Sequence, residues 1–307
     1  MLYDVIIIGS GPAGLGAAIY AEQARLNTLV IEKAAMSGGQ ILLTEAVDNY
    51  PGIPSIGGFE LGQKLREHAE QQGAHFVTDE ITCVDFGADH GYAVKTLRGK
   101  KQEYQTRALI VAAGASHKKL GVPGEDAYIG RGVSYCAVCD GAFYRGLDAV
   151  VVGGGNIAAE DALYLSRFCR SVRLIHRRDV LRASAILQEQ LKQTENIEIL
   201  WNTVVEEICG GSLVESVKLR NRETGENRIL PANGVFVAVG INANSEIFLP
   251  ELHCESGFIA ASEDCVTNIP GVFAAGDIRT KKLRQVVTAV SDGACAVSSA
   301  EEYLRTL

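Results

Sequence analysis

Two cysteines separated by two residues, Cys136 and Cys139, are the side chains in this sequence best suited to chemistry. A Cys-x-x-Cys pair can close a small disulfide ring and lower the pKa of one thiol, so it can accept and pass on two electrons. A structural zinc site would need four ligands, and the remaining cysteines offer no second close pair and no paired histidines. The spacing therefore favours a redox dithiol over a metal site. The remaining six are Cys83, Cys169, Cys209, Cys254, Cys265 and Cys295.

Two glycine-rich turns each follow a short apolar stretch of the kind that forms a buried strand. The first, Gly9-Ser10-Gly11-Pro12-Ala13-Gly14, is followed by a helical stretch to about residue 25 and a strand over 28–31. The second, Gly153-Gly154-Gly155-Asn156-Ile157-Ala158, is followed by a helix to about residue 166 and a strand over 172–175. In each complete βαβ unit the glycine backbone can approach a pyrophosphate at the helix N-terminus. The sequence therefore predicts an α/β fold with two dinucleotide-binding domains.

The second strand of each βαβ unit ends in residues of different charge. Glu32 stands 23 residues after Gly9, and His176 stands 23 residues after Gly153, so the two positions correspond. A carboxylate there binds ribose hydroxyls and repels a 2′-phosphate, which suits FAD or NAD. His176-Arg177-Arg178, with Arg182 four residues on, can grip a 2′-phosphate, which suits NADPH. The alternative is that these arginines form an ordinary solvated helix face.

Further candidate residues lie in loops and near the C-terminus. Residues 37–40 and 49–52 are glycine-, proline- and amide-bearing loops that could contact a large planar cofactor or form plain turns. A buried strand over 267–277 ends in Asp277, which could accept a hydrogen bond from a sugar or ribityl hydroxyl. Arg284 and Gln285 precede a helical stretch to about residue 304, whose N-terminus could stabilise the negative charge of a reduced flavin.

The bulk properties suit a two-domain enzyme. At 307 residues the chain can form about two domains, each with its own core. The 29 basic and 37 acidic residues give a net charge of −8 with no basic run, so nucleic acid and anionic membrane are poor partners. The sequence shows no charged leader or membrane-length apolar stretch, and its scattered cysteines fit a reducing compartment, so we expect a cytoplasmic protein.

Together these motifs resemble the low-molecular-weight thioredoxin reductases of bacteria, which are flavoproteins of the two-dinucleotide-fold disulfide reductase class. The resemblance runs from end to end and includes the dithiol in the second domain. It implies that residues 1–117 and 245–307 form a discontinuous FAD domain, into which an NADPH domain of residues 118–244 is inserted. It also implies a cytoplasmic homodimer whose substrate is thioredoxin or a thioredoxin-like protein.

The resemblance assigns roles to individual residues. It implies that Cys139 faces the flavin, that Cys136 attacks the partner protein, and that Asp140 is the general acid and base, although Asp140 could also be a simple turn residue. The implied FAD contacts are Gly9, Ser10, Gly11, Pro12, Ala13, Gly14, Glu32, Lys33, Gly39, Gln40, Asn49, Gly114, Gly276, Asp277, Arg284 and Gln285. The implied NADPH contacts are Gly153, Gly155, Asn156, Ile157, His176, Arg177, Arg178 and Arg182.

Ile157 departs from the family pattern, because similar reductases usually have a serine or threonine hydroxyl near the NADPH pyrophosphate at this position. The resemblance further implies that hydride passes from nicotinamide to flavin, then to the Cys136–Cys139 disulfide, and finally to the partner by thiol exchange. Since the dithiol and the nicotinamide site belong to one inserted domain, we expect that domain to rotate about the crossings at 115–122 and 240–245.

Two other functions compete with this interpretation. A flavin-dependent dithiol oxidase acting on a small molecule would need no NADPH site, so the arginine cluster argues against it. A nucleotide-sensing protein would bind FAD and respond to its thiol state without reducing any protein disulfide. Replacing Cys136 would leave a sensor nearly unchanged, whereas it would stop transfer to the partner in a reductase.

Overall fold

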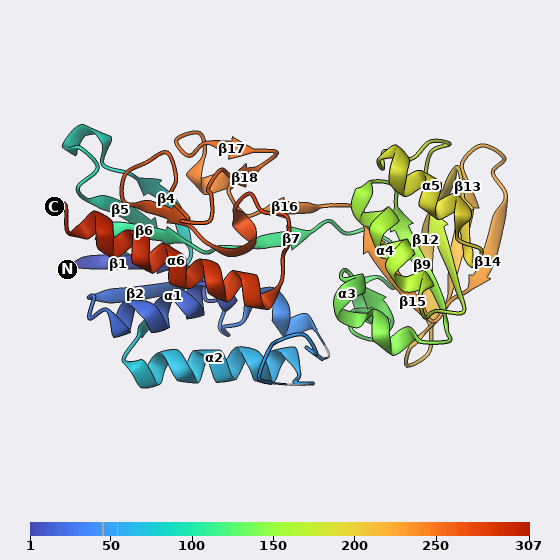
Figure 1. Cartoon of the computed structure of the whole chain (residues 1–307), viewed down its shortest axis with the longest axis horizontal. Coiled ribbons are helices and arrows are strands. Elements are labelled where there is room, and N and C mark those ends of the chain that lie inside the picture. The colour runs from blue at the N-terminus through green and yellow to red at the C-terminus, as the bar shows by residue number, and fades with distance from the viewer. Residues whose placement is uncertain (45, 54) are drawn as a thin grey trace. The chain divides into compact units, whose positions relative to one another are not determined.

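The computed structural model describes all 307 residues of the chain except Glu45 and Pro54 (Figure 1). The chain folds into two compact units. The first comprises Met1–Leu42, Val47–Ser116 and Asn242–Leu307, and the second is built on His117–Ile241. The chain passes from one unit to the other along two short strands that pair with each other, β7 (Ala115–His117) and β16 (Ile241–Ala243). The second unit is therefore an insertion in the chain of the first.

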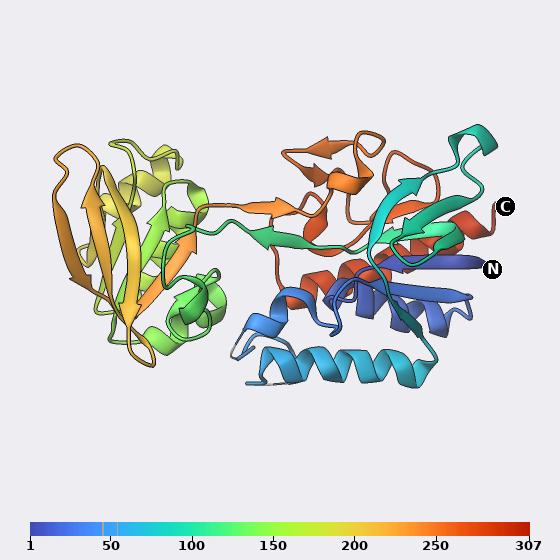
Figure 2. The ribbon, with the colours of Figure 1, turned by 180° about the vertical axis from the view of Figure 1, so that it is seen from behind.

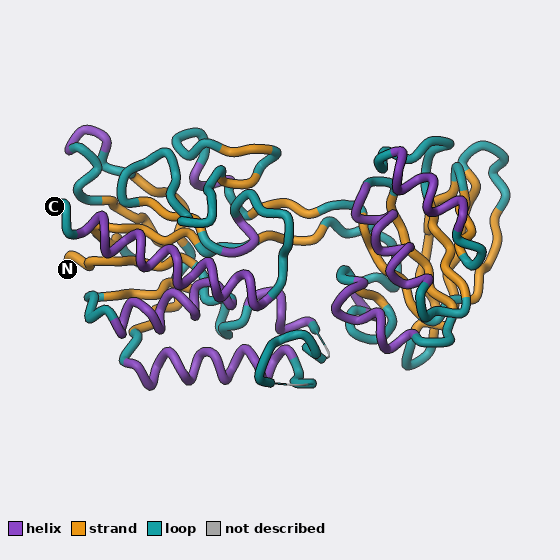
Figure 3. Tube along the Cα trace, in the orientation of Figure 1, coloured by secondary structure: helices purple, strands orange, loops and turns teal. Residues whose placement is uncertain are grey.

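A mixed seven-stranded sheet forms the centre of the first unit (Figure 3). Its order is β3-β2-β1-β6-β5-β4, and β19 lies beside the last residues of β6. The strands are β1 (Leu2–Ile8), β2 (Thr28–Glu32), β3 (His75–Thr78), β4 (Ile81–Asp85), β5 (Lys95–Gly99), β6 (Glu103–Val111) and β19 (Val272–Ala274). The helices are α1 (Pro12–Gln23), α2 (Gly58–Gln72) and α6 (Val286–Leu304), and a small hairpin pairs β17 (Cys254–Glu255) with β18 (Phe258–Ile259).

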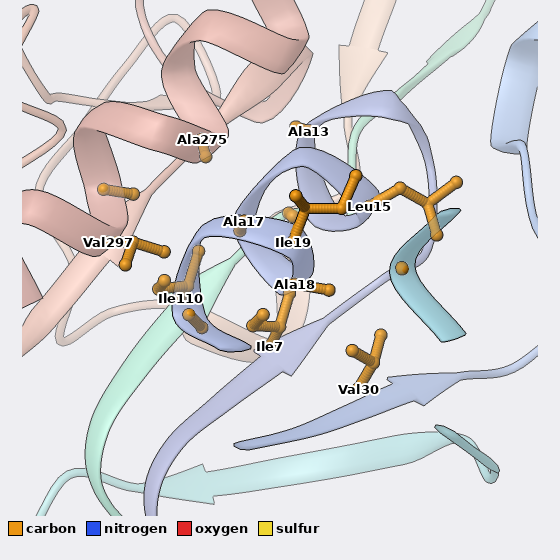
Figure 4. Close-up of a cluster of buried hydrophobic side chains, with 14 of the residues drawn as sticks. Ile7, Ala13, Leu15, Ala17, Ala18, Ile19, Val30, Ile110, Ala275 and Val297 are labelled. Carbon is orange, nitrogen blue, oxygen red and sulfur yellow. The ribbon is translucent and has the colours of Figure 1, made fainter. Parts of the chain in front are cut away.

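The apolar strands of this sheet are buried on both faces. Val5, Ile6 and Ile7 are completely buried, and successive side chains of a strand point to opposite faces. Ile7 belongs to a cluster that includes residues of α1 and Val297 of α6 (Figure 4), whereas Ile6 belongs to a cluster on the other face that includes Phe248. A parallel arrangement of β1, β2, β6 and β19 needs such cover on both faces, which explains their unbroken apolar sequences.

Glycines allow α1 and α6 to pack with almost no space between their backbones. A Cβ atom on Gly293 of α6 would lie 2.2 Å from the carbonyl oxygen of Ala13, and one on Gly16 would lie 3.0 Å from that of Val290. Side chains at these positions would separate the two helices. The close packing fixes the start of α6 relative to the first glycine turn.

The second unit has a parallel five-stranded sheet and a separate antiparallel three-stranded sheet, which Figure 2 shows from behind. The five-stranded sheet has the order β11-β10-β9-β15-β8, and its strands are β8 (Val133–Ser134), β9 (Asp148–Gly153), β10 (Ser171–Ile175), β11 (Ile197–Leu200) and β15 (Gly234–Ala238). The small sheet contains β12 (Thr203–Gly210), β13 (Val214–Asn221) and β14 (Asn227–Pro231). The helices are α3 (Ala137–Asp140), α4 (Asn156–Ser166) and α5 (Ala185–Gln193). Helix α4 packs on one face of the larger sheet, and the small sheet packs on the other.

The predicted α/β class with two nucleotide-type βαβ units is confirmed. Each unit repeats the order strand, glycine turn, helix and parallel strand, through β1-α1-β2 and β9-α4-β10. The strand predicted over 267–277 is wrong in extent, because only Val272–Ala274 pairs as β19. Pro270 and Gly271, whose φ is +71°, turn the chain just before it. None of the helices in the described residues is long and apolar enough to cross a membrane.

Candidate functional site

The first glycine turn leaves the N-terminus of α1 open to an anion. Gly9 has a φ of +100°, and a Cβ atom there would lie 2.5 Å from the carbonyl oxygen of Ala112, so only glycine fits. Gly11 is the N-cap residue of α1, and Pro12 occupies its first turn. A glycine N-cap has no side chain to bond the first N–H groups, which therefore remain available to a phosphate.

Glu32, at the end of β2, is bound to this turn and retains capacity for one more donor. Its Oε2 accepts hydrogen bonds from the backbone N–H and the hydroxyl of Ser10, at 2.7 and 2.9 Å. Its Oε1 accepts one from the N–H of Ala34 at 2.9 Å. A carboxylate has about four acceptor positions, so about one remains for a ribose hydroxyl. The neighbouring Lys33 is exposed.

Other predicted FAD contacts gather around the same turn. The N–H of Gly38 donates to the carbonyl of Ser10 at 2.8 Å, and a Cβ atom on Gly39 would lie 3.4 Å from the Cα of Gly11. Gln40 follows in a short 3-10 helix and is half-buried. The loop predicted from its glycines and amide therefore lies against the glycine turn.

The later predicted contacts are brought to the start of α1 and α6. A Cβ atom on Gly276 would lie 2.8 Å from that of Ala13, so the chain after β19 passes directly over α1. Gln285 is the N-cap residue of α6, and its Oε1 accepts a hydrogen bond from Asn49 Nδ2 at 2.8 Å. Gly114, which follows β6, lies with a φ of +67°.

Two buried polar atoms in this unit lack a hydrogen-bond partner among the described residues. They are Oδ1 of Asp277 and Nε of Arg284. Burial raises the pKa of Asp277, and the guanidinium of Arg284 lies 4.2 Å above the ring of Phe258. Buried groups of this kind need a partner, so this part of the unit is suited to a polar ligand.

A buried ion cluster supports the loop that carries Asp277, and the sequence interpretation missed it. Asp292 of α6 accepts two hydrogen bonds from Arg279, at 2.9 and 2.8 Å, and one from Lys281 at 2.7 Å. It also accepts from the N–H of Gly276 at 2.9 Å. The only signal in the sequence is an aspartate on the same helical face as the buried alanines of α6.

The two predicted redox cysteines are joined in a disulfide, with their Cα atoms 5.3 Å apart. Cys136 is the N-cap residue of α3, and Cys139 lies inside that short helix. Ser134 Oγ donates to the carboxylate of Asp140 at 2.5 Å and accepts from the N–H of Cys136 at 3.0 Å. The serine therefore connects the predicted acid to the dithiol. Nothing in the local sequence pattern pointed to it.

The second glycine turn repeats the design of the first. A Cβ atom on Gly153 would lie 2.4 Å from the carbonyl oxygen of Ala238, whereas one on Gly155 would meet no atom of the described residues within 4 Å. Gly155 is also the N-cap residue of α4, so the open space lies at a helix N-terminus. Asn156 and Ile157 are at the surface in the first turn of that helix, and Ile157 is exposed.

The predicted NADPH cluster divides into exposed and buried residues. Arg177, Arg178 and Arg182 are exposed, and none of them belongs to an ion pair in the part of the chain that the structure describes. His176 is instead buried, with 6 % of its surface exposed, and its ring contacts the glycine turn. Three exposed guanidinium groups in the segment that follows β10, the strand paired with the one that leads into the glycine turn, suit an anionic ligand. Within the described residues, no three His, Cys, Asp or Glu side chains gather as a metal site requires.

Comparison with known proteins finds one family over nearly the whole chain. Residues 3–293 match the family model described as pyridine nucleotide-disulphide oxidoreductase. The thioredoxin reductase of Listeria innocua is 46 % identical over 308 residues, covering 100 % of this chain and 95 % of the relative. That of Bacillus subtilis is also 46 % identical, covering 100 % and 96 %.

Solved structures agree. The thioredoxin reductase of Streptococcus pyogenes matches with a TM-score of 0.93 at 41 % identity, covering 100 % of this chain and 99 % of that one. The chain therefore belongs to the pyridine nucleotide-disulphide oxidoreductase family, in its group of low-molecular-weight thioredoxin reductases.

Proposed function

We propose that the protein is an NADPH-dependent thioredoxin reductase. It passes electrons through FAD and the Cys136–Cys139 dithiol to the disulfide of thioredoxin or a thioredoxin-like protein. The observation that carries this proposal is the Cys136–Cys139 disulfide, which lies in the same folded unit as a glycine turn and three exposed arginines that follow the neighbouring strand. Membership of the family itself implies the use of FAD and of NAD(P)H.

The residues of the first unit fit FAD. The open helix N-terminus after Gly11 suits the pyrophosphate, and the spare acceptor position of Glu32 suits a ribose hydroxyl. The buried Oδ1 of Asp277, which has no partner in the described chain, would accept a hydrogen bond from a ribityl hydroxyl. Gln285, at the N-terminus of α6, would face the pyrimidine edge of the flavin.

The residues of the second unit fit NADPH better than NADH. The space beside Gly155 would accommodate the pyrophosphate, and the exposed Arg177, Arg178 and Arg182 would bind the 2′-phosphate by charge-assisted hydrogen bonds. Ile157 supplies no hydroxyl at the pyrophosphate and leaves 52 % of its surface exposed. Affinity therefore depends on backbone N–H groups and on the arginines.

Bound FAD supplies a two-electron carrier between the nicotinamide and the disulfide. Two electrons and two protons convert the Cys136–Cys139 disulfide to two thiols. Asp140 takes the proton of the Cys136 thiol, and the resulting thiolate attacks one sulfur of the partner's disulfide to form a mixed disulfide. The expelled partner thiolate then takes that proton back from Asp140. Cys139 next attacks the sulfur of Cys136 and gives up its proton to the leaving partner sulfur, which releases the second partner thiol and restores the original disulfide. Ser134 holds Asp140 for this proton transfer through its 2.5 Å hydrogen bond.

We further propose that the active protein is a cytoplasmic homodimer whose second unit turns about the paired strands β7 and β16 during turnover. Short paired strands that join two compact units are suited to act as a hinge. Solved relatives of nearly equal identity support the rotation. The Lactococcus lactis thioredoxin reductase described as in the FR conformation matches with a TM-score of 0.68 at 43 % identity, against 0.93 for the Streptococcus pyogenes enzyme at 41 %.

A turnover assay tests the proposed function. Purified holoenzyme should oxidise NADPH when thioredoxin from the same organism is added, and much more slowly with NADH. Cys136→Ser should abolish thioredoxin reduction while NADPH still bleaches the flavin absorbance. Cys83→Ser, which changes an exposed free cysteine of the other unit, is the matched control and should retain full turnover. Turnover that survives in Cys136→Ser, or flavin that NADPH fails to bleach, would contradict the proposal.

A further inference from the structure

His176 fills the space that the missing side chain of Gly154 leaves in the second glycine turn. It follows β10 directly and is buried, with 6 % of its surface exposed. A Cβ atom on Gly154 would lie 2.1 Å from the imidazole Cε1, so the ring occupies the position of the missing side chain. The ring therefore lies against the backbone of the turn rather than among the exposed arginines.

Both ring nitrogens of His176 face carbonyl oxygens. Nδ1 lies 2.9 Å from the carbonyl oxygen of Gly153, and Nε2 lies 3.1 Å from that of Val180. A neutral imidazole carries one N–H and can donate to only one of them, whereas an imidazolium donates to both. One of the two bonds therefore depends on protonation of the ring.

These two carbonyls belong to two different parts of the nucleotide site. Gly153 belongs to the pyrophosphate turn, and Val180 lies in the loop between Arg178 and Arg182. Two further bonds join the same segments, because the N–H of Arg182 donates to the carbonyl of Gly154 at 2.7 Å and that of Ser184 donates to Asn156 Oδ1 at 2.9 Å. Among these links, only the hydrogen bonds of the His176 ring depend on whether a side chain is protonated.

We propose that His176 is a positioning residue that takes up a proton when a 2′-phosphorylated nucleotide binds, and so fixes the arginine loop to the pyrophosphate turn. The inference rests on the proposed function, since it assumes that NADPH occupies this unit. It gives the site a means of coupling recognition of the 2′-phosphate to the geometry of the pyrophosphate turn.

The charges around the ring support this linkage. Arg178 and Arg182 are the charged groups that act on it from the loop, the glycine turn contributes only carbonyls, and Trp201 presents its uncharged ring 6.4 Å away. Burial lowers the pKa of His176, the two carbonyls oppose that effect, and the two arginines add to it. A bound 2′-phosphate would neutralise the arginines and bring negative charge close, so the pKa would rise.

Because nucleotide binding would raise the pKa of His176, the affinity for the nucleotide should depend on pH. The relevant pH range lies between the pKa of His176 in the free protein and its higher pKa in the nucleotide-bound protein. Within that range, the affinity for the 2′-phosphorylated nucleotide should rise by up to about tenfold for each unit by which the pH falls. The 2′-phosphate acts in the opposite direction, because its dianion binds arginine more strongly and is favoured at higher pH. Protons taken up on binding would therefore come to the histidine, because the phosphate can only release them.

Calorimetric titration of the holoenzyme with NADP⁺ tests the inference without turnover. Titrations at pH 7 in two buffers of different ionisation enthalpy give the number of protons taken up. Wild type should take up protons with NADP⁺ and none with NAD⁺, and its affinity for NADP⁺ should rise as the pH is lowered from 8 to 6.5. His176→Asn, which keeps one donor but does not titrate, should bind NADP⁺ without proton uptake. Fluorescence of Trp201, the single tryptophan, provides a second measure of binding.

Proton release or no exchange in wild type, or uptake that persists in His176→Asn, would overturn the inference. The wild-type measurement alone decides the matter if the variant fails to fold. Tight NADP⁺ binding without uptake refutes the role of His176 and leaves the proposed function intact. Equal affinity for NADP⁺ and NAD⁺ in wild type at every pH would refute the NADPH preference and the inference together.

Discussion

Replacing Asp292 with asparagine will measure how strongly the loop around Asp277 depends on one buried carboxylate. The side chains of Asp292, Arg279 and Lys281 are each more than nine-tenths buried, so water cannot take the place of the lost charge. The Asp292→Asn change would keep the size of the side chain and one acceptor, but it would leave two buried cations facing a neutral group. It would also weaken the bond to the N–H of Gly276, next to Asp277.

The expected loss of stability follows from the burial. Removing one partner of a buried ion pair costs roughly 3–5 kcal/mol, and we expect about 3 kcal/mol because the amide retains one acceptor. For a unit of this size, each kcal/mol lowers the melting temperature by roughly 2–4 °C, so the expected drop is about 6–12 °C. Burial raises the pKa of Asp292, but hydrogen bonds from Arg279 and Lys281 outweigh it and hold that pKa below its usual value. This stabilisation is therefore present above the ordinary aspartate pKa and is lost as the pH falls through the lower folded value.

Thermal unfolding followed by circular dichroism and by release of flavin fluorescence is the assay. Glu60→Gln is the matched control, because Glu60 and Lys64 form an exposed pair on α2 in the same unit, and such pairs contribute about 0–1 kcal/mol. The difference between wild type and Asp292→Asn should shrink on acidification below about pH 4. A variant that unfolds within about 1 kcal/mol of wild type at neutral pH would refute the reasoning, as would an equal loss in the control.

Three further changes have defined outcomes. Gly14→Ala would place a Cβ atom 1.9 Å from the carbonyl oxygen of Gly9, so the turn must open, and the purified variant should lack flavin absorbance; a fully yellow variant would contradict this. Arg182→Gln should raise the KM for NADPH by roughly 10- to 100-fold, the value of one charge-assisted hydrogen bond, and leave the KM for NADH unchanged in steady-state assays. Ser134→Ala removes the bond to Asp140 and should slow thioredoxin reduction by about tenfold or more while stopped-flow reduction of the flavin by NADPH keeps its rate.

The parts of the fold that depend on local sequence were predictable. A strand, a glycine turn and a helix form a contiguous unit, so residues 9–32 and 153–176 could be recognised from glycine spacing and apolar stretches alone. The positions of Glu32 and of the three arginines after the second strand of each unit were predictable for the same reason, whereas their roles in binding remain predictions. The fold class and the family inferred from these motifs are confirmed.

Contacts that join distant segments were not predictable. Asp292 meets Arg279 and Lys281 only because α6 packs against the chain that follows β19, and no local pattern marks a buried aspartate. His176 looked like a member of the exposed cationic cluster, yet the absence of a side chain at Gly154 admits its ring into the turn. Side-chain direction at the end of a strand depends on its neighbours, which the spacing of residues does not specify.

Anaerobic titration of the purified yellow enzyme with NADPH, read by flavin absorbance and by thiol content, tests most directly the flow of electrons into the dithiol. Each NADPH delivers two electrons, so wild type should consume about two equivalents per chain, one for the flavin and one for the Cys136–Cys139 disulfide. Cys136→Ser should consume about one. Equal consumption by wild type and variant, with no new thiols in wild type, would show that the disulfide lies outside the electron path.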